Sequence, residues 1–202
     1  EEKTSIYLDV DPLLDLDLSK YLKEPKEKIL GVSLRSWFNN KFLIEKVSQA
    51  LNELLKEDKD LKLFLIPFDL NLDIEIIEAL KNYFPSDRLY SFEIKTLEDV
   101  IEALSQCKFF LGMRLHSLIL AYKLNKPFLT LSYDVKTEEF VNLVNGDFIK
   151  TTELNEKELF FKLKKLLVSE PLPLKSFPYK TPLIFEEFIK KNFSLETSKI
   201  SS

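Results

Sequence analysis

From residue 28 onward, short runs of apolar residues alternate with longer stretches in which apolar residues recur every three or four positions. The short runs predict buried strands, and the longer stretches predict helices with one buried face. The predicted strands span 29–34, 61–68, 88–92, 108–113, 128–132 and 148–149. The predicted helices include 115–124, which is apolar nearly all round, 138–144 and 156–168. Thr96, followed by Asp99, has the spacing of a capping box at the start of a further helix.

This alternation predicts the fold class. Strands that alternate with helices of about 10 to 15 residues indicate βαβ units and a parallel sheet with helices on both faces. We therefore expect an α/β protein with a doubly wound, mostly parallel, Rossmann-like sheet. Right-handed crossovers place the loops that follow the strands at one edge, where such folds bind ligands. In the usual order the first and fourth strands are neighbours, so we expect their loops to face each other.

We expect the chain to divide into three parts. Residues 1–27 are expected to be the end strand and linker of an N-terminal domain that lies upstream of this sequence, which begins with Glu1 rather than Met. Residues 28–169 are expected to form the Rossmann-like domain. Residues 170–202 are expected to be a proline-rich tail that ends in a helix over 183–193.

Composition narrows the classes of function. With 29 basic and 33 acidic residues the net charge is -4, the opposite of the basic footprint of nucleic-acid binding, so we expect no nucleic-acid partner. One cysteine and one histidine exclude a disulfide within the chain and a Cys/His zinc site, so we expect no metal. No apolar run reaches about 18 residues, so we expect a cytoplasmic protein without a transmembrane segment, at most peripheral to the inner membrane face. Abundant Lys and Glu beside one Met hint at a thermophile.

Glycine is scarce, because the chain has only Gly31, Gly112 and Gly146. A Gly-rich phosphate loop of the dinucleotide-binding or Walker type is therefore excluded. Any phosphate must be bound by other groups.

Candidate binding groups follow three of the predicted strands. Arg35 follows the first strand, Arg114 and His116 follow the fourth, and Lys136 follows the fifth. A cation at a helix amino terminus costs about 0.3 to 1 kcal/mol, and all but Arg35 would occupy such a position. A bound anion, held by backbone N–H groups and these side chains, would relieve the mismatch. Gly31 and Gly112 would let the backbone approach it closely. We therefore expect a phosphate or carboxylate site.

Structural interpretations of the same residues stay open. A lone histidine is more often a structural hydrogen-bonding group than a catalyst, and Arg35 could form a surface ion pair. Lys136 could be a solvated charge, and Tyr133 suits a core position as well as a ligand platform. Cys107, at the end of an apolar helix, is expected to be inert packing.

A resemblance to a known family sharpens this picture. The string LGMRLHSLILA over 111–121, then Lys126 and Pro127, then SYDVK over 132–136, resembles the signature of the polysaccharide pyruvyl transferases of the bacterial cell-wall type. The resemblance extends more loosely over 11–12, 31–35 and 65–68. It implies the carboxyl-terminal domain of a fold similar to GT-B glycosyltransferases. Asp69 departs from the family pattern, so its loop is left out of the expected site.

The resemblance also implies an activity. Members of the family transfer an enolpyruvyl-derived group from phosphoenolpyruvate to two hydroxyls of one sugar, which makes a cyclic ketal and releases phosphate. It implies that residues 28–169 bind this donor, that no further cofactor is needed, and that the acceptor is a lipid- or nucleotide-linked cell-wall saccharide. His116 would act as general acid with Arg114 as its catalytic partner. The implied substrate-binding residues are Arg35, Lys136, Gly112, Ser117, Ser132 and Tyr133.

Two other functions stay open. The chain could belong to a GT-B glycosyltransferase that uses a nucleotide sugar, with Glu138 or Glu139 on the ribose hydroxyls. It could also be a non-catalytic module that binds a phosphorylated metabolite. A homo-oligomer is compatible with each of these functions. Because we expect the acceptor site to span the upstream domain, this chain alone could be inactive.

Overall fold

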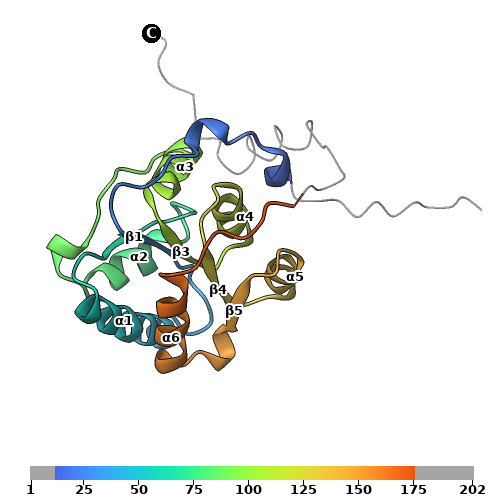
Figure 1. Cartoon of the computed structure of the whole chain (residues 1–202). Helices are drawn as coiled ribbons and strands as arrows, with labels where there is room; N and C mark the ends of the chain where they lie inside the picture. The colour runs from blue at the N-terminus through green and yellow to red at the C-terminus, as the bar shows by residue number, and fades with distance from the viewer. Residues whose placement is uncertain (1–11, 176–202) are drawn as a thin grey trace, which may run out of the picture.

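A five-stranded parallel sheet forms the centre of the protein in the computed structural model, which describes residues 12–175 (Figure 1). The strand order is β2-β1-β3-β4-β5. The strands are β1 (Ile29–Ser33), β2 (Lys62–Leu65), β3 (Phe109–Gly112), β4 (Phe128–Ser132) and β5 (Asp147–Lys150). This confirms the doubly wound α/β fold expected from the sequence.

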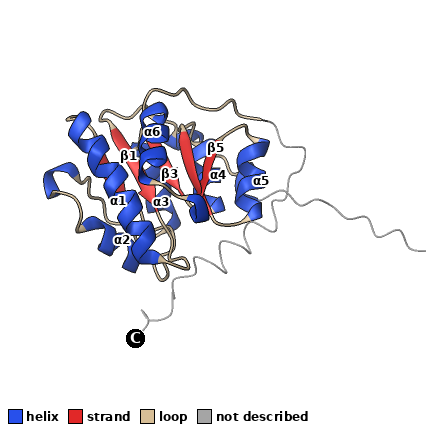
Figure 2. Cartoon of the chain, turned by 90° about the horizontal axis from the view of Figure 1, so that it is seen from below, coloured by secondary structure: helices blue, strands red, loops and turns tan. Residues whose placement is uncertain are grey.

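Helices cover both faces of the sheet (Figure 2). One face packs against α1 (Asn40–Glu57), α2 (Ile74–Lys81) and α6 (Glu156–Leu166). The other face packs against α3 (Leu97–Gln106), α4 (Leu115–Lys123) and α5 (Val135–Leu143). Thr96 forms the expected capping box with Asp99 at the start of α3.

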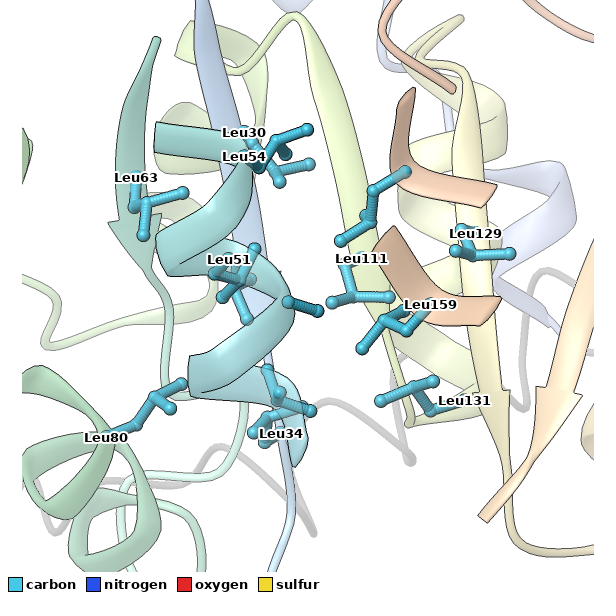
Figure 3. Packing of buried hydrophobic residues seen from close by; sticks show 14 of the residues in the cluster. Leu30, Leu34, Leu51, Leu54, Leu63, Leu80, Leu111, Leu129, Leu131 and Leu159 are labelled. Carbon is cyan, nitrogen blue, oxygen red and sulfur yellow. The ribbon is translucent and has the colours of Figure 1, made fainter. Parts of the chain in front are cut away.

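The first of these layers is built largely from leucine. In Figure 3, Leu51 of α1 and Leu159 of α6 lie over the sheet close to Leu111 of β3, and all three side chains are fully buried. Burying one such side chain stabilises the folded state by about 1.5 to 3 kcal/mol. A well-packed layer of this kind holds the strands, and therefore the loops at their carboxyl ends, in fixed positions.

The prediction of a strand over 88–92 is wrong. Ser86–Arg88 forms a short 3-10 helix, and Leu89 makes only an isolated parallel bridge with Leu63 at the edge of the sheet. The physical reason is Arg88, whose guanidinium donates hydrogen bonds to the backbone carbonyls of Leu55, Asp58 and Leu61. These bonds hold the segment in a turn, and a single bridge remains where the sheet would have gained a strand.

The predicted neighbours β1 and β3 are adjacent in the sheet. Ser33 lies opposite Gly112, and the pairing continues past the strand end because the N–H of Met113 donates to the carbonyl of Ser33 at 3.1 Å. The loop that follows β1 and the loop that follows β3 therefore start side by side. This adjacency is what brings Arg35 and Arg114 to the same part of the edge.

The segments at either end of the described chain pack on the α3 and α4 side. Two 3-10 helices, η1 (Pro12–Asp15) and η2 (Ser19–Tyr21), contact α4 and α3. In the tail, the carbonyl of Pro173 accepts a hydrogen bond from the Tyr122 hydroxyl of α4 at 2.7 Å. The helix predicted over 183–193 lies outside the described residues. The division into three parts stays a prediction, and no helix between residues 12 and 175 is long and apolar enough to cross a membrane.

Candidate anion-binding site

The helix that follows β3 starts without a capping side chain. Among the helices of the described chain, α1, α3, α5 and α6 each have an N-cap side chain that accepts a backbone N–H, whereas α2 and α4 have none. Uncapped N–H groups carry the positive end of the helix dipole and favour an anion. The amino terminus of α4 is therefore available for a ligand at the carboxyl edge of the sheet.

Arg114, which immediately precedes α4, is held by a carboxylate that the sequence did not reveal. Its Nε and Nη2 donate to the two carboxylate oxygens of Asp73 at 2.8 and 2.6 Å. Asp69 lies 3.9 Å from the same guanidinium. Burial works to lower the pKa of Arg114, but the hydrogen bonds and charge of Asp73 outweigh it and raise the pKa. The charge of Arg114 is thus matched by the protein itself.

Arg35 has a different environment. Its Nη1 donates to the Tyr133 hydroxyl at 2.8 Å, and its guanidinium carbon lies 4.6 Å from the centre of the Tyr133 ring and 5.8 Å from that of Trp37. The two rings lie 4.8 Å apart. Among residues 12–175 no carboxylate forms an ion pair with Arg35. Arg35 is thus a cation that lies against a pair of aromatic rings, with no carboxylate of the described chain to match its charge.

Two buried polar atoms at the end of β1 lack partners within the described chain. They are the hydroxyl oxygen of Ser33, which is fully buried, and Nε of Arg35. Buried polar atoms in folded proteins nearly always have a hydrogen-bonding partner. A ligand or a bound water beside the end of β1 would supply one.

Arg35, Tyr133 and Arg114 form one cluster, which we call the arginine cluster. Tyr133 binds Arg35 directly and lies close enough to Arg114 to contribute to the electrostatics that raise its pKa. The three residues come from the loops after β1, β4 and β3. The structure thus brings together three of the residues singled out in the sequence.

His116 and Ser117 occupy the first turn of α4. Ser117 is buried, and its hydroxyl donates to the carbonyl of Arg114 at 2.6 Å. His116 is partly buried and follows Arg114 by two positions. Both residues therefore lie at the uncapped helix terminus beside the arginine cluster.

The two glycines near the site make room for packing. A Cβ on Gly31 would lie 2.7 Å from the sulfur of Cys107, and a Cβ on Gly112 would lie 2.5 Å from a ring carbon of Phe110. Packing alone accounts for glycine at both positions. Close approach of a ligand to the backbone there stays a prediction. Cys107 itself is buried, and burial raises its pKa to about 12, which suits an inert packing role.

The loop after β4 caps the helix that follows it, although the buried hydroxyl of Thr137 lacks a partner within the described chain. Asp134 accepts the N–H of Thr137 and caps α5, which begins at Val135 rather than at the predicted residue 138 for this reason. The hydroxyl of Ser132 bonds to the carbonyl of Asp134 and to the carboxylate of Glu138. Lys136 is exposed, and the structure shows no contact between it and the arginine cluster.

Asp73 and Asp69 are the site residues that the sequence interpretation missed. Asp73 stands directly before α2, where an aspartate ordinarily caps the helix, so its position gave no signal of a distant partner. Asp69 was left out because of its departure from the family pattern. As for metals, no three His, Cys, Asp or Glu side chains within residues 12–175 are grouped to hold an ion.

The fold and site together define a Rossmann-like domain with a candidate anion-binding edge, and sequence comparison identifies its family. The family model for polysaccharide pyruvyl transferase matches residues 6–135. The chain belongs to the polysaccharide pyruvyl transferase family. No curated protein matches the chain in sequence.

Solved structures with a similar fold include one complex with UDP and two UDP-GlcNAc 2-epimerases. The Staphylococcus aureus MnaA–UDP co-structure has a TM-score of 0.58 and 19% identity, covering 80% of this chain and 41% of that chain. UDP-GlcNAc 2-epimerase of Neisseria meningitidis bound to UDP-GlcNAc has a TM-score of 0.57 and 13% identity, covering 73% and 38%. The Methanocaldococcus jannaschii UDP-GlcNAc 2-epimerase has a TM-score of 0.57 and 12% identity, covering 85% and 47%. The chain thus spans less than half the length of these proteins, and the likeness confirms the expected fold alone.

Proposed function

We propose that this chain is the donor-binding part of an enzyme that transfers the enolpyruvyl group of phosphoenolpyruvate to a saccharide, forms a cyclic ketal and releases phosphate. Membership of the family supports the reaction class. The observation that carries the choice of donor is Arg35, a guanidinium whose charge no carboxylate of the described chain matches. Phosphoenolpyruvate carries both a carboxylate and a phosphate, and arginine binds either group through two parallel hydrogen bonds.

The donor would lie between Arg35 and the amino terminus of α4. Arg114 keeps Nη1 without a hydrogen bond to the described residues, so it can add one bond to the anion. The uncapped N–H groups of α4 would add further bonds. Ser117, Gly112 and Ser132 remain proposed contributors, whereas the exposed Lys136, on the capped helix α5, is proposed to contribute little; Tyr133 acts by holding Arg35.

In the proposed mechanism, His116 protonates the methylene carbon of phosphoenolpyruvate while a sugar oxygen bonds to the neighbouring carbon. The proton of that hydroxyl restores the protonated imidazole. The C–O bond to phosphate then breaks, and the phosphate leaves with the electron pair. The second hydroxyl of the same sugar adds to the resulting oxocarbenium centre, its proton departs with the phosphate, and the ketal ring closes. No further cofactor takes part in this scheme.

The proposed acceptor is a lipid- or nucleotide-linked saccharide, which we place in the cytoplasm or at the inner membrane face. The nucleotide-sugar alternative draws on the similar fold of the UDP-bound proteins, and it would use Glu138 or Glu139 for the ribose. Glu138 is already bonded to Ser132 and lies 3.6 Å from the ammonium group of Lys150. These contacts argue against Glu138 as the ribose-binding acid, whereas Glu139 is exposed, so the choice of donor rests on Arg35 and on the family.

Calorimetric titration of the chain with phosphoenolpyruvate and, separately, with UDP-GlcNAc tests the proposal. We expect saturable binding of phosphoenolpyruvate and none of UDP-GlcNAc. The opposite pattern would reject the proposed donor. A control titration with inorganic phosphate shows whether the carboxylate contributes, and we expect phosphate to bind more weakly.

A further inference from the structure

Asp73 is a buried carboxylate used in an unusual way. Its side chain is fully buried and stands at the N-cap of α2, yet it makes no capping bond to that helix. Instead its two oxygens accept both bonds from Arg114, and one of them also accepts the N–H of Asp69 at 2.9 Å. Helix α2 therefore lacks a side-chain N-cap hydrogen bond, which ordinarily contributes about 1 kcal/mol to stability.

The bidentate hydrogen bond between Asp73 and Arg114 also fixes the start of a second helix, α4. The carbonyl of Arg114 accepts the Ser117 hydroxyl and the N–H of Leu118, so Arg114 is the residue from which α4 is built. Two parallel bonds hold a guanidinium in one plane and one orientation. Asp73 thereby links the amino terminus of α2 to that of α4.

We infer that Asp73 is a positioning residue for the donor site: it orients Arg114 and the first turn of α4, which carries His116. The inference rests on the proposed function for the identity of the donor, but not for the effect on His116. By matching the charge of Arg114, Asp73 also leaves Arg35 as the unmatched cation of the cluster. A merely structural ion pair would stabilise the fold without affecting donor binding or the setting of His116.

The chain offers two intrinsic reporters, because Trp37 is its one tryptophan and His116 its one histidine. Trp37 lies 5.8 Å from the guanidinium of Arg35, so its fluorescence should respond to a donor bound there. The imidazole C–H signal of His116 in a proton NMR spectrum needs no assignment among histidines.

The experiment compares the wild type with Asp73→Asn, Asp73→Asn/Arg114→Gln and the control Asp87→Asn, whose carboxylate is exposed. Asp73→Asn leaves a largely buried guanidinium with only Asp69, 3.9 Å away, as a charged partner, so we expect the urea midpoint to fall by about 1 M. The double variant removes both charges and should regain most of that loss. We expect the dissociation constant for phosphoenolpyruvate to rise at least about tenfold in both variants, a loss of about 1.4 kcal/mol. Asp87→Asn should match the wild type.

The His116 signal distinguishes a change in the surroundings of the imidazole from a change in the net charge of the protein. Asp73→Asn raises the net charge by one and the double variant leaves it unchanged, so a displacement that appears in both variants reports changed surroundings of the imidazole rather than the net charge. We expect a displacement in both Asp73 variants. A wild-type dissociation constant in Asp73→Asn, or a His116 signal that superimposes on the wild type in both variants, would overturn the inference. If the wild type binds no phosphoenolpyruvate, the proposed function fails, and the NMR signal still decides the role of Asp73.

Discussion

Arg35 and Arg114 follow neighbouring strands at the same edge of the sheet, but their surroundings differ. Arg114 has two-pronged bonds to Asp73 and a second carboxylate, Asp69, nearby. Arg35 instead lies against two aromatic rings, those of Tyr133, whose hydroxyl it also bonds, and Trp37, with no carboxylate of the described chain as its partner. Aromatic rings hold a guanidinium in place without cancelling its charge. We therefore propose that Arg114 serves chiefly as framework and that Arg35 is the main cation for a ligand.

The helices that begin near these loops differ in the same way. The amino terminus of α5 is capped by Asp134, whereas α4 has no capping side chain. An anion would therefore gain more at α4 than at α5. Within the described chain, Arg35 has no carboxylate partner and α4 has no capping side chain, so this part of the edge is our candidate anion site.

The largest effect is expected from His116, the proposed proton donor, rather than from either arginine. In the full enzyme, His116→Ala should reduce kcat about 100-fold or more, because general acid catalysis is lost. The dissociation constant for phosphoenolpyruvate should change less than about threefold. Steady-state kinetics beside a binding titration would measure both. A variant with normal turnover would show that His116 is structural, and a protein with no turnover before mutation would favour the binding-module alternative.

The arginines should differ most in stability. Arg114→Ala leaves the fully buried Asp73 carboxylate without its partner, so we expect a loss of about 3 kcal/mol in the free energy of unfolding. Arg35→Ala removes no matched charge and should cost less than about 1 kcal/mol. Urea unfolding followed by circular dichroism measures both values. Equal losses in the free energy of unfolding would contradict the proposed division, in which Arg114 supports the fold and Arg35 binds the ligand.

Tyr133→Phe tests what holds Arg35. The substitution removes one hydrogen bond at 2.8 Å but keeps the ring. A bond of this kind contributes about 0.5 to 1.5 kcal/mol, so we expect phosphoenolpyruvate to bind about 2- to 10-fold more weakly. Calorimetry can resolve this change. Unaltered affinity would mean that the ring, rather than the hydroxyl, orients the guanidinium.

Lys136 should have the smallest effect. It is exposed on a helix that Asp134 already caps, and it has no contact with the arginine cluster. Lys136→Gln should therefore change the affinity for phosphoenolpyruvate less than about twofold. A larger loss in the same titration would place the donor nearer to α5 than we propose.

The fold follows from local patterns in the sequence, whereas the site depends on distant partners. Apolar runs and helical periods were sufficient to predict the parallel sheet and the adjacency of β1 and β3. The strand predicted over 88–92 failed because the side chain of Arg88 bonds to carbonyls at least 27 residues away, which no local pattern shows.

In the candidate site too, local patterns indicated the residues but not their distant partners. Arg35 and Arg114 could be selected because charged residues follow predicted strands. Their separate roles could not be predicted, because Asp73 precedes Arg114 by 41 residues and Tyr133 follows Arg35 by 98. Gly31 and Gly112 were interpreted as ligand access, yet their neighbours Cys107 and Phe110 fill the space beside them.

The most direct test of the central claim, that Arg35 binds the donor, is a titration of Trp37 fluorescence with phosphoenolpyruvate. The wild type, Arg35→Gln and the control Lys59→Gln, an exposed cation in the loop before β2, are compared at one ionic strength. We predict a saturable change in the wild type and in the control, and a dissociation constant at least about tenfold higher in Arg35→Gln. A wild-type dissociation constant in Arg35→Gln would contradict the claim.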